Sequence, residues 1–199
     1  MIFVNDVINH EEHKRMYLSR IEEYKKTHDS IMPIGYTAIP SELEKNSKDR
    51  VVHSDFHISG KENTNLNFFE ELFTNTDMRN LLTKIGEDLH LNKFGEFTWM
   101  LDNVWFQQYE KNGEHCWHNH PHCHFTNVYF LEMPNEKDKT EVLGLNNKLY
   151  SYEAKEGQMI TFPGFLQHRS NTITSDRKTI ISFNTSYQVP KFSPSMTSY

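Results

Sequence analysis

The stretch Glu114-His115-Cys116-Trp117-His118-Asn119-His120-Pro121-His122-Cys123-His124 is the most informative part of this chain. Five of the twelve histidines fall within residues 115–124. Neutral imidazole is the commonest side-chain metal ligand near neutral pH. On an extended chain, residues at i and i+2 point to the same side, so His118 and His120 can reach one ion. On a helix this pair would diverge, so the cluster predicts a metal site on a strand and a turn.

A third ligand is expected from a distant strand that lies alongside the first. His168 is the best candidate, because it follows residues 157–163, which combine a turn, a strand and a proline that ends the strand. The residues alone leave three interpretations open: a catalytic metal, a structural zinc that uses Cys116 and Cys123, or a surface loop without a metal. The Cys-x6-Cys spacing is not one of the usual zinc-finger or zinc-ribbon patterns.

The second half of the chain predicts β structure, because aromatic and β-branched residues concentrate there between short turns. Strands are expected at residues 97–101, 104–106, 125–131, 149–152, 158–162 and 179–187. Short strands at this spacing favour a sandwich or a barrel, and the jelly roll is one such architecture.

The first half predicts helices. Residues 11–26 have helical apolar spacing and can be capped by Asn9 or Asp6. Residues 65–91 form a second helical region, broken near 74–76, whose apolar stripes would pack against a sheet. Residues 31–40 contain two prolines and a glycine and predict a loop or an edge strand. We therefore expect a single domain over 1–199, with a mostly helical support region at 1–95, a jelly-roll core at 96–189 and a flexible tail at 190–199.

Composition and charge argue against a nucleic-acid-binding protein, a membrane protein and a secreted protein. The net charge of −6 gives no electrostatic footprint for nucleic acid or an anionic membrane. No apolar run approaches the roughly 20 residues that a membrane span needs. The first six residues are too short and acidic for a secretory signal, and two cysteines cannot form a disulfide framework. We expect a cytoplasmic protein, and the sequence leaves its oligomeric state open.

The order of residues beyond the histidine cluster resembles the iron(II)/2-oxoglutarate oxygenase superfamily. The pair His118 and His120 is followed by the strand 125–132, then by a distal His168 and by Arg177 nine residues later. The resemblance covers roughly residues 104–187. It is greatest to oxygenases of marine bacteria and their phages, and more distant to prolyl hydroxylases. The His-x-His pair alone is a weak motif, whereas the full series is fairly specific.

The resemblance implies an α+β fold with a mainly β core, a double-stranded β-helix supported by N-terminal helices. It also implies iron(II) ligands at His118, His120 and His168, with a histidine at position 120 where most members carry a carboxylate. Arg177 matches the basic residue that binds the distal carboxylate of 2-oxoglutarate, for which a planar guanidinium is suited. Lys178 is the rival, because strand alternation turns only one of the two inward.

Further contacts follow from the same resemblance. Tyr109 and Thr126 are expected to touch the cosubstrate. Trp105, His122 and His124, with Lys178, are expected at the substrate mouth or around the ligands. The implied activity is hydroxylation of a peptidyl residue or a small molecule, with release of succinate and CO2, in a bacterial or phage-infected host cell. Two alternatives are a three-histidine cupin-type metal enzyme that does not use 2-oxoglutarate and a non-enzymatic jelly-roll metal-binding module, and the protein could carry another divalent metal when purified.

Overall fold

The computed structural model describes residues 1–31, 51–56 and 66–189. The predicted tail at 190–199 and nearly all of the predicted loop at 31–40 lie outside these residues. Within the described part no helix is long and apolar enough to cross a membrane. The described α-helices all precede residue 89, and most strands follow residue 97; β1 and β2 are the strands of the first half.

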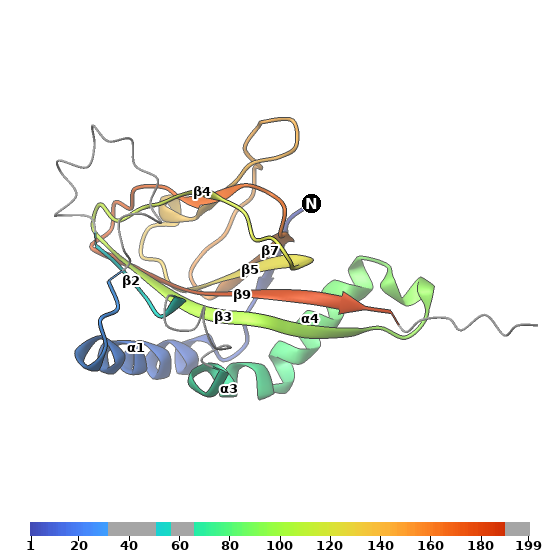
Figure 1. Cartoon of the computed structure of the whole chain (residues 1–199), viewed down its shortest axis with the longest axis horizontal. Helices are drawn as coiled ribbons and strands as arrows, with labels where there is room; N and C mark the ends of the chain where they lie inside the picture. Colours follow the sequence, from blue (N-terminus) through green and yellow to red (C-terminus); the bar gives the residue numbers. More distant parts are fainter. Residues whose placement is uncertain (32–50, 57–65, 190–199) are drawn as a thin grey trace, which may run out of the picture.

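Two antiparallel sheets form the double-stranded β-helix core (Figure 1). The larger sheet has the order β1-β7-β5-β9-β3-β2, and the smaller has the order β4-β8-β6. The strands of the larger sheet are β1 (Phe3–Asp6), β2 (Val52–Ser54), β3 (Thr98–Glu110), β5 (Phe125–Glu132), β7 (Gln158–Pro163) and β9 (Arg177–Gln188). Those of the smaller sheet are β4 (His115–His118), β6 (Thr140–Val142) and β8 (His168–Ser170). The predicted α+β fold with a jelly-roll core is confirmed.

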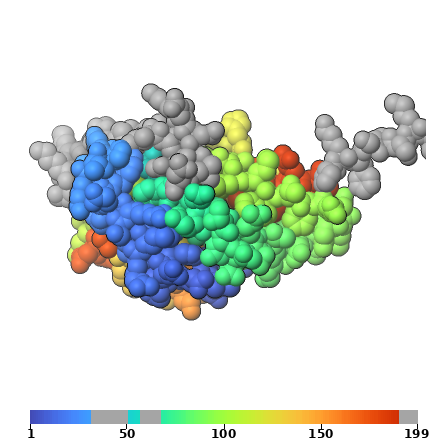
Figure 2. Space-filling model, turned by 90° about the horizontal axis from the view of Figure 1, so that it is seen from below, coloured from blue at the N-terminus to red at the C-terminus, as the bar shows by residue number. Residues whose placement is uncertain are grey.

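The helices α1 (His10–Thr27), α3 (Leu66–Thr74) and α4 (Thr76–Asp88) cover the outer face of the larger sheet (Figures 1 and 2). The predicted break between two helices is confirmed at Asn75, whose Oδ1 accepts a 2.7 Å hydrogen bond from the Asp77 backbone and caps α4. Asn9 precedes α1 but its side chain makes no capping hydrogen bond. Tyr17 and Leu82 from the helices are buried in the same apolar cluster as Phe183 of β9. Two short 3-10 helices, η3 (Leu91–Phe94) and η4 (Glu136–Asp138), complete the elements of the described residues.

Strand β3 decides which side chains face the site. The sequence predicts two strands at 97–101 and 104–106, but the structure has one continuous strand with an irregularity between Leu101 and Asn103. This bulge shifts the alternation by one residue. Val104 and Phe106 therefore pack toward the helices, and Trp105 and the alternating residues after it face the smaller sheet.

The predicted strand at 149–152 is wrong. Only one isolated bridge, Leu143 to Leu149, pairs this segment. Tyr150 and Tyr152 instead pack, partly buried, against the apolar cluster between the two sheets. The aromatic content that predicted a strand thus serves side-chain packing. The short strands β1, β2 and β6 were not predicted, because three or four residues are too few to show a period. The extended chain expected at His118 and the adjacent strand expected at His168 correspond to β4 and β8.

Candidate metal centre

Three histidines converge at one end of the space between the sheets. His118 ends β4, and His168 begins β8 directly opposite it in the antiparallel register. His120 lies in the turn after β4. The ring centroids are 4.2 Å apart for His118 and His168, 4.8 Å for His120 and His168, and 5.2 Å for His118 and His120. One nitrogen of each ring lies within 4.8 Å of the other two. The structure therefore brings together the three residues that the sequence predicts.

Each ring is oriented by a hydrogen bond at its Nδ1 atom. The Nδ1 of His118 lies 2.7 Å from the backbone oxygen of Cys116, and that of His168 lies 3.2 Å from the backbone oxygen of Leu166. The Nδ1 of His120 lies 2.7 Å from the side-chain oxygen of Asn184. Because each acceptor is a carbonyl oxygen, each Nδ1 carries the proton and each Nε2 has a free lone pair. This is the arrangement found behind metal-bound imidazoles.

Burial keeps the three imidazoles neutral. Desolvation lowers the pKa of His118, of His168 and, to about 4, of His120. A metal ligand must be unprotonated, so the rings are in the state that binds a cation at neutral pH. Imidazole ligands suit iron, zinc, copper and nickel. The three rings contribute no negative charge, and a divalent ion held by them would therefore favour an anionic ligand at its open positions.

A second group of possible ligands, His10, Glu11 and Glu156, lies on the far side of the larger sheet. Of its two carboxylates, that of Glu156 is already engaged, since Glu156 pairs with Lys14 and accepts a 2.7 Å hydrogen bond from the backbone of Met133. A metal would have to displace these partners. The three-histidine group is the stronger candidate.

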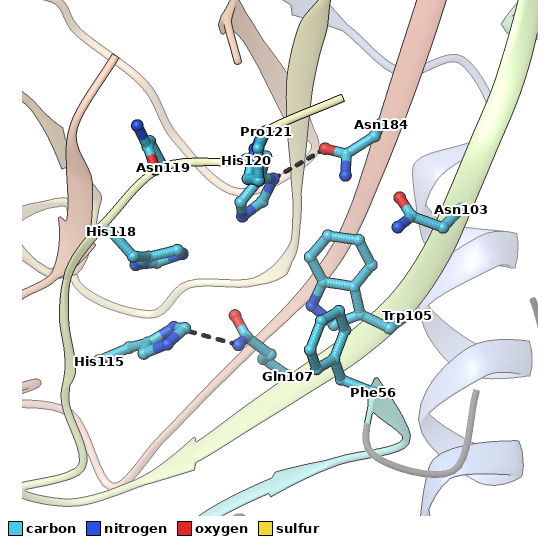
Figure 3. A pocket seen from close by; sticks show the side chains of 10 residues that line it. All are labelled: Phe56, Asn103, Trp105, Gln107, His115, His118, Asn119, His120, Pro121 and Asn184. Carbon is cyan, nitrogen blue, oxygen red and sulfur yellow. Dashed lines mark hydrogen bonds between the residues drawn. The ribbon is translucent and has the colours of Figure 1, made fainter. Parts of the chain in front are cut away.

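An outer cavity of about 380 Å³ opens in front of His118 and His120 (Figure 3). Its walls combine aromatic rings, amides and histidines, and none of the described lining residues is Asp, Glu, Lys or Arg. The lining residues are Phe56, Asn103, Trp105, Gln107, His115, His118, Asn119, His120, Pro121 and Asn184. A substrate of small-molecule or side-chain size fits this space.

An inner cavity adjoins the outer one at the triad and extends deeper between the sheets; both cavities are lined by Trp105, Gln107, His115, His118 and His120. The inner cavity measures only about 10 Å³ and is lined by His168, Tyr109, Ser170 and Ile180 among others. Lys178 lies beside two of these residues. Its Nζ donates a 3.0 Å hydrogen bond to the Ser170 hydroxyl and lies 5.0 Å from the centre of the Tyr109 ring. The triad thus borders a wide outer cavity and a narrow inner one.

Lys178 and Arg177 have opposite orientations on β9. Lys178 is fully buried, and among the described residues no carboxylate forms an ion pair with it. Burial lowers the pKa of its ammonium group to about 7. Arg177 turns to the outer face, where its Nε and Nη2 bind Glu132 at 2.7 and 2.8 Å and its Nη1 lies 3.3 Å from Glu22. The expectation that Arg177 faces the site is therefore corrected: strand phase turns Lys178 inward, and Glu132 already occupies the guanidinium.

Tyr109 and Thr126 both lie close to the centre, in different roles. The Tyr109 hydroxyl donates a 2.9 Å hydrogen bond to Gln107, and its ring faces the Lys178 ammonium. The Thr126 hydroxyl lies 3.0 Å from Nδ1 of His120 and donates to Asn184 at 3.3 Å. Thr126 therefore supports a candidate ligand, whereas Tyr109 lines the inner cavity.

Of the residues expected at the substrate mouth, one lines a cavity and two do not. Trp105 lines the outer cavity, with its ring centroid 5.3 Å from that of His120. His122 and His124 are exposed and line none of the cavities found in the described residues. The Nδ1 of His124 instead accepts a 3.0 Å hydrogen bond from the Tyr187 backbone. The backbone has a positive φ at His122, and neither His122 nor His124 contributes to the outer cavity.

The sequence did not predict the role of Asn184 or the place of Gln107 and His115. Asn184 orients His120 from 64 residues away. His115 stacks on His118 with ring centroids 4.0 Å apart, and Gln107 lies 3.2 Å from its Nδ1. Alternation along β9 from an inward Lys178 would have placed Asn184 on the inner face. The alternation along β9 can be used in this way only when it is known that Lys178 faces inward.

Comparisons with known proteins show the fold. The sequence matches no protein-family model, and no curated protein matches it. The non-heme alpha ketoglutarate dependent epimerase SnoN from nogalamycin biosynthesis is 9% identical, with a TM-score of 0.62 over 94% of this chain and 77% of that chain. A Pseudomonas putida prolyl-4-hydroxylase is 10% identical, with a TM-score of 0.53 over 92% of this chain and 91% of that chain.

A third similar structure is a prolyl hydroxylase from Trichoplax adhaerens in complex with a hypoxia inducible factor oxygen degradation domain peptide fragment. It is 11% identical, with a TM-score of 0.51 over 92% of this chain and 82% of that chain. The chain therefore has the fold of 2-oxoglutarate and iron(II) oxygenases and prolyl hydroxylases. At these identities the likeness concerns the fold alone.

Proposed function

We propose that this protein is a non-haem iron(II)- and 2-oxoglutarate-dependent dioxygenase, which hydroxylates a peptidyl residue or a small molecule and releases succinate and CO2. The observation that carries the proposal is the proximity of two features on the inner side of the fold. One is a neutral three-histidine cluster with three available Nε2 atoms. The other is Lys178, a buried cation without a carboxylate partner among the described residues.

The three imidazoles would hold iron(II) through Nε2, and their Nδ1 hydrogen bonds would fix the rings. Bound iron(II) would supply the activation of dioxygen, coupled to oxidative decarboxylation of 2-oxoglutarate. His120 takes the place of the more usual carboxylate, so the dianionic cosubstrate would supply charge that the protein does not. The chain itself contributes orientation and the exclusion of water.

Lys178 would bind the distal carboxylate of 2-oxoglutarate. Its ammonium has three donors, and one is used by Ser170. A carboxylate at this position would receive a charge-assisted hydrogen bond in a site shielded from water. The Ser170 hydroxyl and the ring of Tyr109 would border the same group. This assigns to Lys178 the function that the sequence first suggests for Arg177.

The direct test is oxygen-dependent conversion of 2-oxoglutarate to succinate by the full chain with iron(II), followed by NMR in the presence and absence of candidate substrates. Lys178→Met should abolish conversion, whereas Arg177→Met should retain it. These two neighbours on one strand are a matched pair. Absence of succinate in the wild-type protein, with iron bound and dioxygen present, would reject the proposal.

The size of the inner cavity favours one alternative, a three-histidine metal enzyme that does not use 2-oxoglutarate. A volume of about 10 Å³ holds roughly one water molecule, so a five-carbon dicarboxylate requires side chains around Lys178 to move. In this alternative the substrate itself would ligate the metal from the outer cavity of about 380 Å³. Metal binding without any binding of 2-oxoglutarate in calorimetric titration would favour it.

A further inference from the structure

Two polar atoms in the wall of the outer cavity lack partners. The indole Nε1 of Trp105 and the side-chain oxygen of Asn103 are both buried, and neither has a hydrogen bond within the described structure. Trp105 is only 4% exposed. A buried donor or acceptor without a partner destabilises the protein, so such atoms are rare unless they serve a ligand. Here one is a donor and the other an acceptor.

The two atoms belong to one short piece of β3. Asn103 and Trp105 are two residues apart after the bulge, so both side chains stand on the inner face, and both line the cavity. Figure 3 shows the indole nitrogen on the edge of the ring that faces the histidines. The Cα atoms of residues i and i+2 of a strand are about 7 Å apart, and their side chains stand side by side on one face. An amide group has one acceptor and one donor, so it can form a hydrogen bond with each of two such neighbours.

The surroundings match an uncharged ligand. Asn184 is directly opposite Asn103 in the register of β3 and β9, and its oxygen is engaged by His120, so it offers a ligand only its NH2 donor. Phe56 packs edge to face on Trp105, with ring centroids 5.0 Å apart. A charged group would enter this wall without an ionic partner among its described residues. A neutral group with one donor and one acceptor would find both.

We propose that the outer cavity recognises a neutral amide that bears an N–H, and that this amide belongs to the substrate. The inference rests on the proposed function only in taking the ligand of this cavity to be the substrate. Trp105 Nε1 donates to the amide carbonyl oxygen, and Asn103 Oδ1 accepts from the amide N–H. Trp105 and Asn103 are then substrate-binding residues that hold the neighbouring carbon atoms in front of His118 and His120.

Three small probes test this arrangement: benzamide, N-methylbenzamide and N,N-dimethylbenzamide. All three have a carbonyl acceptor and an aromatic ring, but the last has no N–H. Their dissociation constants are measured by ligand-observed NMR on the zinc-loaded full chain. N-Methylbenzamide should bind about tenfold more tightly than N,N-dimethylbenzamide, as expected for one net hydrogen bond. Equal affinity of these two probes for the wild-type protein would overturn the proposal.

Two variants separate the two hydrogen bonds. Trp105→Phe removes the indole N–H and should weaken all three probes about tenfold. Asn103→Ala removes the acceptor and should weaken benzamide and N-methylbenzamide about tenfold while leaving N,N-dimethylbenzamide unchanged. Trp99→Phe is the matched control, because Trp99 lies on the same strand but packs toward the helices. The proposal is overturned if Trp105→Phe has no more effect than Trp99→Phe, or if Asn103→Ala weakens all three probes equally.

The probes also distinguish two sources of an amide. Tighter binding of N-methylbenzamide indicates a peptide bond, and tighter binding of benzamide indicates a primary carboxamide. Because binding is measured without turnover, the result is independent of the succinate assay. Succinate formation combined with failure of the amide pattern would refute this inference alone. The amide pattern without succinate formation would support it and reject the cosubstrate assignment.

Discussion

Replacement of Lys178 by methionine should stabilise the protein and at the same time remove its affinity for 2-oxoglutarate. The lysine is fully buried and makes one hydrogen bond, to Ser170 at 3.0 Å. Methionine has a similar length and no charge, so it can occupy the same space between Tyr109 and Phe130. A buried cation that awaits a ligand lowers stability in the ligand-free protein, and this is what the substitution removes.

The magnitude follows from the pKa. Burial lowers the pKa of Lys178 from 10.5 to about 7. At about 1.4 kcal/mol per pH unit, this costs the folded state about 4–5 kcal/mol at pH 7. Loss of the hydrogen bond to Ser170 offsets about 1 kcal/mol of the gain. Lys178→Met should therefore raise the free energy of unfolding by about 3–4 kcal/mol, which corresponds to roughly 10 °C in Tm for a chain of this size.

The gain should decrease as pH rises. Between pH 7 and 10.5 the unfolded chain binds a proton at Lys178 that the folded protein does not, so the stability of the wild-type protein rises with pH in this window. The methionine variant lacks this proton uptake. Its advantage should fall by about 1.4 kcal/mol per pH unit above pH 7 and vanish between about pH 9 and 10, below the unfolded pKa of 10.5 because the lost hydrogen bond to Ser170 still counts against the variant. Urea unfolding at pH 7, 8 and 9, followed by circular dichroism, measures the trend.

Binding should change in the opposite direction. A distal carboxylate would face an apolar side chain, and an unpaired buried charge costs about 3–5 kcal/mol, or at least a hundredfold in affinity. Calorimetric titration of the metal-loaded protein with 2-oxoglutarate measures this loss. Arg177→Met is the control, since its ion pairs with Glu132 and Glu22 are partly exposed and lie on the outer face. A Lys178→Met protein that is less stable than wild type and binds 2-oxoglutarate normally would refute the reasoning.

Four further outcomes follow from the structure. A divalent metal at a hundred times its Kd should raise the free energy of unfolding by about 2.7 kcal/mol, seen as a Tm increase of roughly 5–10 °C by scanning fluorimetry and absent in His168→Ala. Because burial lowers the pKa of His120 to about 4, the metal-induced shift should persist at pH 6 and disappear as the pH falls toward 4; its loss already at pH 6 would contradict a neutral triad. Asn75→Ala removes the α4 cap and should lower stability by about 1 kcal/mol, read from the urea midpoint. Gly86→Ala should destabilise by about 1–3 kcal/mol despite the helix preference of alanine, because its Cβ would lie 2.3 Å from a ring carbon of Phe97; an unchanged urea midpoint would show that the ring moves aside.

Local patterns in the sequence were sufficient for features that depend on neighbouring residues. The i and i+2 spacing of His118 and His120 requires only an extended chain to place both rings on one side. The interruption of the helical pattern at Asn75 reflects a capping side chain, which acts within two residues. The position of His168 after a strand and its terminating proline indicated a return to the first pair. These signals depend on residues that are close in the chain, so they can be recognised in a single sequence.

Other features were decided by tertiary structure. Alternation shows that Arg177 and Lys178 face opposite ways, but not which of them faces inward. Both faces of β9 are buried, one under helices and one between the sheets, so its hydrophobic pattern has no period of two that would mark the inner face. The bulge after Leu101 similarly shifts the phase of β3 and so decides that Trp105 and Asn103 share a wall. Only the pairing of strands that are distant in sequence determines which side of the sheet each residue of β3 and β9 faces. The sequence by itself therefore determined the three candidate metal ligands, while the fold determined which cation lies beside them and which polar atoms face the cavity.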